Sequence, residues 1–289
     1  MGFRKIAVIA NPNAGRKRQS EFKSAIDVIS REIDCEVFFT QAPGDAGKIS
    51  QSLAQQTDLL ITACGGDGTV NEVLNGSNLQ NPIGIIPAGT ANVIARELGI
   101  PLNLPEAAKN LFTGAIKRID CGKVQEKRFM MVAGFGYDAH VSGKVNPILK
   151  KILGIYSYYL QAATMYPFYK RPQITIFSNG QEYQGEFALI ANMRRYGGEL
   201  FFAHDALYDD GMLDLVLFRK FDPASILIGL ISAKLRKGVP EKIAYRFRSK
   251  DFSLQSSIPI QFQLDGEAFW PIQNARISLE KKCLPVIIP

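Results

Sequence analysis

The first part of the chain, up to about residue 122, alternates short apolar runs with amphipathic segments. The apolar runs predict buried strands at residues 5–10, 36–40, 59–64 and 82–86. Between and after these runs, apolar residues recur at helical spacing, which predicts helices over residues 20–33, from about 44, from near 69, over 93–98 and over 104–113. Strands that alternate with helices favour a doubly wound parallel sheet.

The pattern changes beyond residue 122, where short apolar or alternating segments are separated by turn residues. They predict strands at residues 129–133, 173–177, 187–191, 213–218, 242–248, 252–255, 260–264 and 275–279. Consecutive strands of this kind are typical of an antiparallel β-sandwich. We therefore expect an α/β domain over residues 1–122 and a β-rich domain over residues 123–289, whose final residues have the option of packing back on the first domain.

Polar or glycine-rich loops follow the first three predicted strands, at Asn11 to Gly15, at Thr40 and at Gly65 to Thr69. Ligands of doubly wound sheets bind at the carboxyl ends of the strands, near the point where the strand order reverses. We therefore expect these three loops to meet in one crevice.

The loop Gly65-Gly66-Asp67-Gly68-Thr69 has the pattern of a phosphate site, because it joins a strand to a helix N-terminus through closely spaced glycines. Within it, the Asp67 carboxylate would repel a bare phosphate. We expect Asp67 to reach a metal ion, a ribose or a neighbouring hydrogen-bond donor instead. A tight turn without any ligand is the alternative interpretation of a single glycine cluster.

Composition and charge narrow the class of protein. No apolar run approaches the roughly 20 residues that span a bilayer, the first residues do not form a signal peptide, and the four cysteines are scattered. These features predict a cytoplasmic protein. Residues 1–121 hold 12 Lys and Arg against 12 Asp and Glu, so the remaining 22 against 15 in residues 122–289 carry the whole net charge of +7.

A basic half of this kind fits either nucleic acid or an anionic membrane. No nucleic-acid recognition motif accompanies the charge, so we expect no nucleic-acid partner. The stretch from Lys144 to Arg171 has basic ends around an apolar, tyrosine-rich middle and lacks acidic residues. It predicts either a helix that rests on an anionic bilayer or a buried helix with basic flanks.

Several short motifs, taken in order, resemble the diacylglycerol kinase catalytic family, which includes bacterial soluble lipid kinases and the sphingosine and ceramide kinases. These motifs are Asn11-Pro12-x-Ala14-Gly15, Gly65-Gly66-Asp67-Gly68-Thr69-x-x-Glu72, Pro87-x-Gly89-Thr90-x-Asn92, Asp210-Gly211 and Asp265-Gly266-Glu267. The Gly-Gly-Asp-Gly motif also occurs in NAD kinases and phosphofructokinases. The first and third motifs favour the lipid-kinase branch.

The resemblance implies a kinase that uses ATP and Mg²⁺ to phosphorylate the hydroxyl of a lipid, with a diacylglycerol-like acceptor. It implies nucleotide contacts from Asn11, Pro12, Asn13, Ala14, Gly15, Thr40, Gly65, Gly66, Asp67, Gly68, Thr69, Glu72, Gly89, Thr90 and Asn92. Arg16 adjoins the first of these loops, and we add it to the nucleotide contacts for that reason.

The resemblance also implies catalytic roles for Asp67, for Asp265 as the general base and for Glu267 beside it, on catalytic magnesium. It further implies a structural magnesium site at Asp210 and the Met212 carbonyl. Two of the carboxylates have simpler alternatives. Asp265-Gly266 is itself a hairpin-turn signal, and Glu72 suits the first turn of a helix.

Two positions depart from the family pattern: Val93 replaces a common aspartate, and Leu207 replaces an oxygen ligand near Asp210. A kinase of a soluble acceptor such as NAD therefore remains open, as does a nucleotide-binding regulator with weak turnover. For the lipid kinase we expect ATP between the two domains, a lipid substrate at an anionic membrane surface and peripheral membrane association. The oligomeric state is open, with a homodimer as one option.

Overall fold

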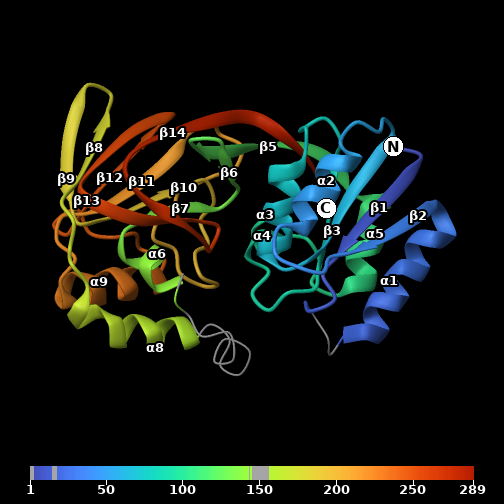
Figure 1. Ribbon diagram of the computed structural model, residues 1–289, viewed down its shortest axis with the longest axis horizontal. Coiled ribbons are helices and arrows are strands. Elements are labelled where there is room, and N and C mark those ends of the chain that lie inside the picture. Colours follow the sequence, from blue (N-terminus) through green and yellow to red (C-terminus); the bar gives the residue numbers. More distant parts are fainter. Residues whose placement is uncertain (1–2, 15–17, 143, 145–155) are drawn as a thin grey trace. The chain divides into compact units, whose positions relative to one another are not determined.

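The computed structural model describes residues 3–14, 18–142, 144 and 156–289 (Figure 1). The chain divides into two compact units. The first unit consists of Met1–Ile119 together with Lys282–Pro289, and the second of Asp120–Lys281. The last strand, β14 (Glu267–Ile288), therefore contributes residues to both units.

Four parallel strands form the centre of the first unit: β1 (Lys5–Ala10), β2 (Asp34–Phe39), β3 (Leu59–Gly65) and β4 (Ile83–Pro87). Their order is β4-β3-β1-β2, and the end of β14 pairs with β4 at Val286. The chain leaves β1 towards β2 and returns to β3 on the opposite side of β1. The predicted parallel sheet is confirmed, and its switch point lies at the carboxyl ends of β1 and β3.

Among the described residues of this unit, five α-helices accompany the sheet: α1 (Gln19–Glu32), α2 (Asp45–Leu53), α3 (Asp67–Gly76), α4 (Val93–Glu97) and α5 (Leu104–Thr113). Helix α1 packs against α5, and α2 packs against α3. All seven residues of β3 are buried, as expected for a central parallel strand. The predicted boundaries of these strands and helices agree with the structure to within about two residues.

Antiparallel strands dominate the second unit. Its main sheet has the order β12-β11-β10-β7-β13-β14, and β8 and β9 form a hairpin that pairs with β13. The predicted antiparallel sandwich is confirmed. These strands are β7 (Val132–Phe135), β8 (Ile174–Ser178), β9 (Gln181–Gly185), β10 (Phe187–Ala191), β11 (Leu213–Phe218), β12 (Ala244–Ser249) and β13 (Asp251–Leu264), preceded by β5 (Ala115–Val124) and β6 (Lys127–Phe129).

Several strand predictions in this unit were wrong in detail, including the one at residues 275–279, which are only part of the 22-residue β14. The expected strand at residues 129–133 is divided, because β6 ends at Phe129 and β7 begins only at Val132. The N–H groups of Met130 and Met131, at this break, donate to a side chain instead of to a neighbouring strand. Residues 252–255 and 260–264 form one continuous strand, β13, whose pairing with β14 shifts register between Gln255 and Ile260.

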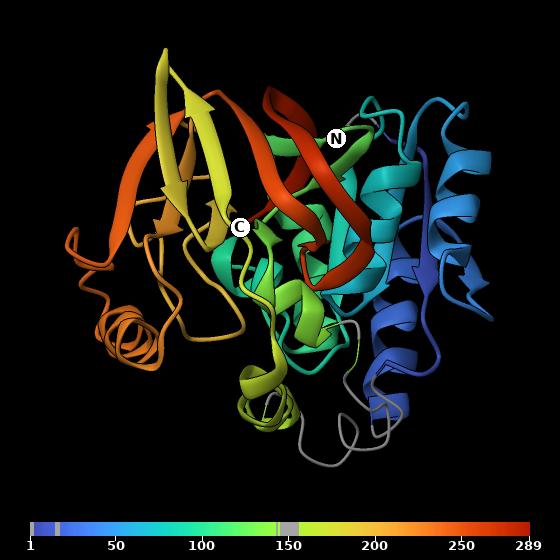
Figure 2. The ribbon, with the colours of Figure 1, turned by 60° about the vertical axis from the view of Figure 1, so that its left-hand side comes forward.

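Three α-helices and one short 3₁₀ segment belong to the described part of the second unit: α6 (Tyr137–Ser142), α8 (Tyr156–Met165), η2 (Tyr166–Phe168) and α9 (Pro223–Lys234). Helices α8 and α9 lie at the same end of this unit, below its strands in both views (Figures 1 and 2). Helix α9 was not predicted from the sequence. Within the described residues, no helix is both long and apolar enough to cross a membrane.

Candidate active site

A cavity of about 230 Å³ opens at the switch point of the first unit. The three loops that were expected to meet there do so, because the ends of β1, β2 and β3 all contribute. The cavity is lined by Asn11, Asn13, Thr40, Gln41, Ala42, Pro43, Ala46, Gly68, Thr69 and Glu72. Six of these ten residues were predicted to contact a nucleotide.

Two glycine loops pack backbone against backbone beside this cavity. The N–H groups of Ala88 and Gly89 both donate to the Gly65 carbonyl, at 2.9 and 3.2 Å. A Cβ atom on Gly89 would overlap the Cα of Gly66, and one on Gly65 would overlap the Thr69 side chain. Larger residues would therefore force the loop after β4 away from the loop after β3.

The Asp67 side chain holds the start of α4. Its Oδ1 atom accepts a hydrogen bond from the Ile94 N–H at 2.9 Å. Burial raises the pKa of the Asp67 carboxyl, and hydrogen bonds from the α4 backbone oppose this rise only in part. Of the partners expected for Asp67, the structure shows a neighbouring donor. Val93, the departure from the family pattern, is buried and apolar at the first position of α4.

Asn92, just before α4, leaves an unusual polar atom buried. The residue adopts a left-handed conformation with φ of 48°, and its Nδ2 donates to the carbonyls of Pro87 and Gly89 at 3.2 and 2.9 Å. Its Oδ1 atom is buried without a hydrogen-bond partner among the described residues. Because an orphaned buried oxygen is costly, this atom indicates a missing donor near the glycine loops.

Other predicted contacts have local partners within the first unit. The Glu72 carboxylate accepts hydrogen bonds from the N–H groups of Gly44 and Ala46, at 2.9 and 3.1 Å, and so anchors the start of α2. Asn11 Oδ1 accepts from the Asn13 N–H at 2.9 Å, which shapes the loop after β1. Pro12 and Ala14 belong to the same loop, Thr90 is exposed beyond Gly89, and Gly15 and Arg16 lie outside the described residues.

The second unit carries Asp265 in the hairpin between β13 and β14. Asp265 and Gly266 have φ values of 52° and 90°, and Leu264 pairs with Glu267 across the turn. Positive φ at both central residues is what a two-residue type I′ hairpin requires. The hairpin alternative is therefore present, and the exposed Glu267 begins β14.

A hairpin turn alone does not require a buried side chain, yet Asp265 is only 7% exposed. Its two carboxylate oxygens accept hydrogen bonds from the N–H groups of Met130, Met131 and Val132, at 2.8, 2.8 and 3.0 Å. Three donors on one carboxylate fix its orientation. They also explain why the predicted strand at residues 129–133 is broken.

Asp138 is a site residue that sequence analysis missed. It lies on α6, and its Oδ2 accepts from the Tyr196 hydroxyl at 2.7 Å and from Gln263 Nε2 at 3.1 Å. Gln263 in turn accepts from the Gly266 N–H at 2.6 Å, so Asp138 is linked to the Asp265 turn through one side chain. No sequence spacing connects residues this far apart. Burial raises the pKa of the Asp138 carboxyl, outweighing its hydrogen bonds.

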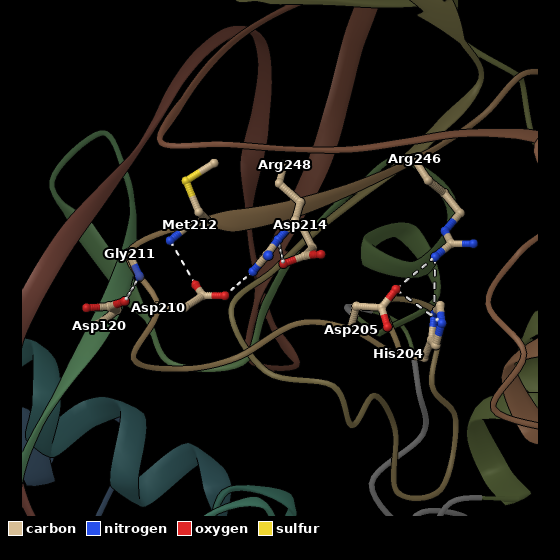
Figure 3. Close-up of polar contacts among 9 residues, drawn as sticks. All are labelled: Asp120, His204, Asp205, Asp210, Gly211, Met212, Asp214, Arg246 and Arg248. Carbon is tan, nitrogen blue, oxygen red and sulfur yellow. Dashed lines mark hydrogen bonds and ion pairs between the residues drawn. The ribbon is translucent and has the colours of Figure 1, made fainter.

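The expected structural metal site at Asp210 already holds a protein cation (Figure 3). The Arg248 guanidinium pairs with the Asp210 carboxylate and donates to Asp214 Oδ2 at 3.3 Å. The other Asp210 oxygen accepts from the Met212 N–H at 3.0 Å. Buried Asp120 accepts from the Gly211 N–H at 2.7 Å and so fixes the same turn.

A structural metal does not fit this arrangement. A divalent cation at Asp210 would lie against the Arg248 charge, and no cluster of three or more metal-ligating side chains occurs within the described residues. Leu207, the other departure from the family pattern, supplies no oxygen side chain. The charge balance that a magnesium ion would provide comes here from Arg248.

Comparison with known protein families finds two matches. Residues 5–124 match the model described as the diacylglycerol kinase catalytic domain, and residues 131–288 match the YegS C-terminal NAD kinase beta sandwich-like domain.

Full-length relatives agree with both matches. A protein named diacylglycerol kinase from Bacillus subtilis is 30% identical over 276 residues, which cover 92% of this chain and 90% of that protein. One of the same name from Staphylococcus saprophyticus is 31% identical over 272 residues, or 90% of this chain and 88% of its own length. The crystal structure of a diacylglycerol kinase from Bacillus anthracis covers 100% of this chain and 98% of its own, with a TM-score of 0.82 and 27% identity.

The close approach of the two glycine loops can be tested by measuring the free energy of unfolding of glycine-to-alanine variants. Gly89→Ala should lower the free energy of unfolding by about 1–3 kcal/mol, because the new methyl group overlaps Gly66. Gly68→Ala is the matched control: nothing lies within 4 Å of its Cβ position, so the change should stay below about 1 kcal/mol. Urea titration measures both. Equal losses in the two variants would contradict the packing argument.

The raised pKa of Asp138 predicts how the free energy of unfolding changes with pH. Because burial raises its pKa above the ordinary value of about 3.9, the folded state holds the proton more tightly than the unfolded chain. The resulting stabilisation is complete below about pH 4 and is lost as pH rises through the raised pKa. Asp138→Asn removes this loss, so the variant should gain stability relative to wild type as pH rises from about 4 to 7. A pH-independent difference in unfolding free energy would contradict it.

Arg248→Ala should destabilise the second unit by about 1–2 kcal/mol, because it leaves the Asp210 and Asp214 carboxylates side by side. The estimate is modest because 40% of the Arg248 side chain is exposed. Arg276→Ala, with an 81% exposed side chain, is the control and should cost less than about 0.5 kcal/mol. A chelator should leave the melting temperature of the wild-type protein unchanged. A lower melting temperature in the chelator would instead show that the protein holds a structural metal ion.

Proposed function

The chain belongs to the diacylglycerol kinase catalytic family and is a lipid kinase, and from this premise we propose that it transfers the γ-phosphoryl group of ATP to the hydroxyl of a diacylglycerol-like lipid. The cavity at the switch point is the observation that carries the ATP part of this proposal. The curated relatives are named diacylglycerol kinases, which supports the choice of acceptor.

The nucleotide phosphates would bind at the start of α3. The first N–H groups of a helix have no intrahelical acceptor and lie at the positive end of the helix dipole, and Gly68 and Thr69 of α3 line the cavity. The absence of a side chain at Gly68 leaves the backbone open to an anion. The orphaned Asn92 Oδ1 can accept a hydrogen bond once a ligand or its water supplies a donor.

Asp265 is the proposed general base. In the transfer step, the lipid hydroxyl loses its proton to the Asp265 carboxylate while its oxygen bonds to the γ-phosphorus and the bond from that phosphorus to the bridging oxygen of ADP breaks. The N–H groups of Met130, Met131 and Val132 hold the carboxylate in one orientation, so little reorganisation is needed during reaction. The Asp138–Gln263 contact steadies the turn behind it.

Magnesium is part of the proposal through the nucleotide. When bound with the nucleotide, Mg²⁺ would neutralise phosphate charge during the transfer. Glu267 is exposed beside Asp265 and is the proposed carboxylate for this ion. We further propose that the enzyme works peripherally at an anionic membrane surface, where its lipid acceptor resides, and that it needs no nucleic acid.

Asp265→Asn tests the catalytic assignment. The variant should lose about 10²–10⁴-fold in the rate of diacylglycerol phosphorylation, while ATP affinity measured by calorimetry is retained because the cavity belongs to the other unit. Asp251→Asn, an exposed aspartate at the start of β13, is the matched control and should keep wild-type turnover. Near-normal turnover of a folded Asp265→Asn protein would refute the role of the general base.

A further inference from the structure

Helix α9 packs on the second unit through its small residues and not through its large apolar ones. Its buried residues are the small ones, Ser225, Gly229 and Ala233. The contact is close, because a Cβ atom on Gly229 would lie 2.8 Å from the Phe218 ring. A surface helix of a globular protein usually does the opposite and buries its large aliphatic side chains.

Three large aliphatic residues of this helix and Leu235 at its C-cap are exposed, whereas Ile226 and Leu230 are partly buried. Leu227, Ile228, Ile231 and Leu235 have exposed fractions of 58%, 42%, 50% and 57%, and we call these four residues the α9 face. Leu227, Ile231 and Leu235 are spaced by four residues and so form one stripe along the helix. A contiguous apolar stripe of this kind marks a surface that binds a partner or a membrane.

Basic residues flank the α9 face at both ends. Lys220 precedes the helix, and Lys234 and Lys237 lie at and beyond its end, all of them exposed. Asp222 is the only acidic residue between positions 219 and 240. Its carboxylate caps the helix by accepting from the Ala224 and Ser225 N–H groups, at 3.0 Å each.

A further exposed apolar residue, Phe168, lies in the segment next to the start of α9. The Tyr166 hydroxyl of η2 donates to the Phe221 carbonyl at 2.8 Å, which joins η2 to the residue before the Asp222 cap. In the same segment Phe168 is 87% exposed, and the exposed Lys170 and Arg171 follow it. Both ribbon views place the two helices α8 and α9 at one end of the unit (Figures 1 and 2).

We propose that the α9 face docks this kinase on anionic membranes, with its aliphatic side chains in the bilayer interface and the flanking lysines against lipid headgroup charges. An apolar stripe bordered by lysines is the arrangement of helices that lie in a membrane interface. This inference rests on the proposed function, because a lipid kinase must reach an acceptor held in the bilayer.

A second copy of the chain is the less favourable occupant. A two-fold contact brings the same surface of each copy together. Because Lys220 lies at one end of α9 and Lys234 and Lys237 at the other, either relative direction of two paired α9 helices opposes lysine to lysine. An anionic membrane satisfies the aliphatic stripe and the lysines at once.

The test is sedimentation with vesicles in the absence of ATP, using phosphatidylcholine with and without phosphatidylglycerol. Leu227→Ser combined with Ile231→Ser should weaken binding to the anionic vesicles at least about tenfold, from the loss of two inserted aliphatic side chains. Lys234→Glu combined with Lys237→Glu should weaken only the anionic-lipid component. Ile116→Ser, 47% exposed in the first unit, and Lys23→Glu on α1 are the controls and should bind as wild type does.

Melting temperatures confirm that each variant is folded, since all these positions are exposed. Wild-type binding by folded α9 variants, or absence of wild-type binding to anionic vesicles, would overturn the inference. So would a dimer that dissociates in the Leu227→Ser, Ile231→Ser protein while vesicle binding persists. Wild-type phosphorylation of diacylglycerol in neutral detergent micelles tests the proposed function separately, so the two failures are distinguishable.

Discussion

Carboxylates that accept hydrogen bonds from backbone N–H groups hold the functional loops of both units. Asp67 holds the start of α4, and Glu72 holds the start of α2. Asp120 fixes the Asp210-Gly211 turn, and Asp265 binds the break between β6 and β7. Loops near a ligand site cannot rely on strand pairing for their backbone hydrogen bonds, and these side chains replace it. Removing Asp265 would leave three buried N–H groups without their acceptor, so this carboxylate acts on a whole loop and not on a single contact.

These backbone contacts bear on the roles expected for the acidic residues in the family motifs. Asp67 and Glu72 lie where a nucleotide is expected, yet their oxygens are engaged with the protein backbone. Through these contacts Asp67 holds the start of α4, and Glu72 holds the loop after β2 beside the cavity. In the second unit, one guanidinium, that of Arg248, pairs with the carboxylates of both Asp210 and Asp214.

The fold was accessible from the sequence where one physical signal dominated. The fully apolar β3 and the glycine loop after it predicted the parallel sheet, its switch point and the meeting of three loops. The strand at residues 129–133 was misread because its apolar pattern continues through Met130 and Met131, whose N–H groups bind Asp265, more than 130 residues away. Asp138 and Arg248 also act through partners outside their own elements, 125 residues away for Gln263 and 38 for Asp210. Helix α9 carried start signals in Asp222 and Pro223, but its apolar residues surround the helix and show no single buried stripe.

We propose that the switch-point cavity serves a kinase whose acceptor is a lipid. The most direct measurement incubates the purified protein with γ-labelled ATP, Mg²⁺ and a total lipid extract, and then separates the organic from the aqueous phase. We expect a single labelled lipid in the organic phase that migrates with phosphatidic acid. Label confined to a water-soluble product, or retained entirely on ATP while the protein binds the nucleotide, would contradict it.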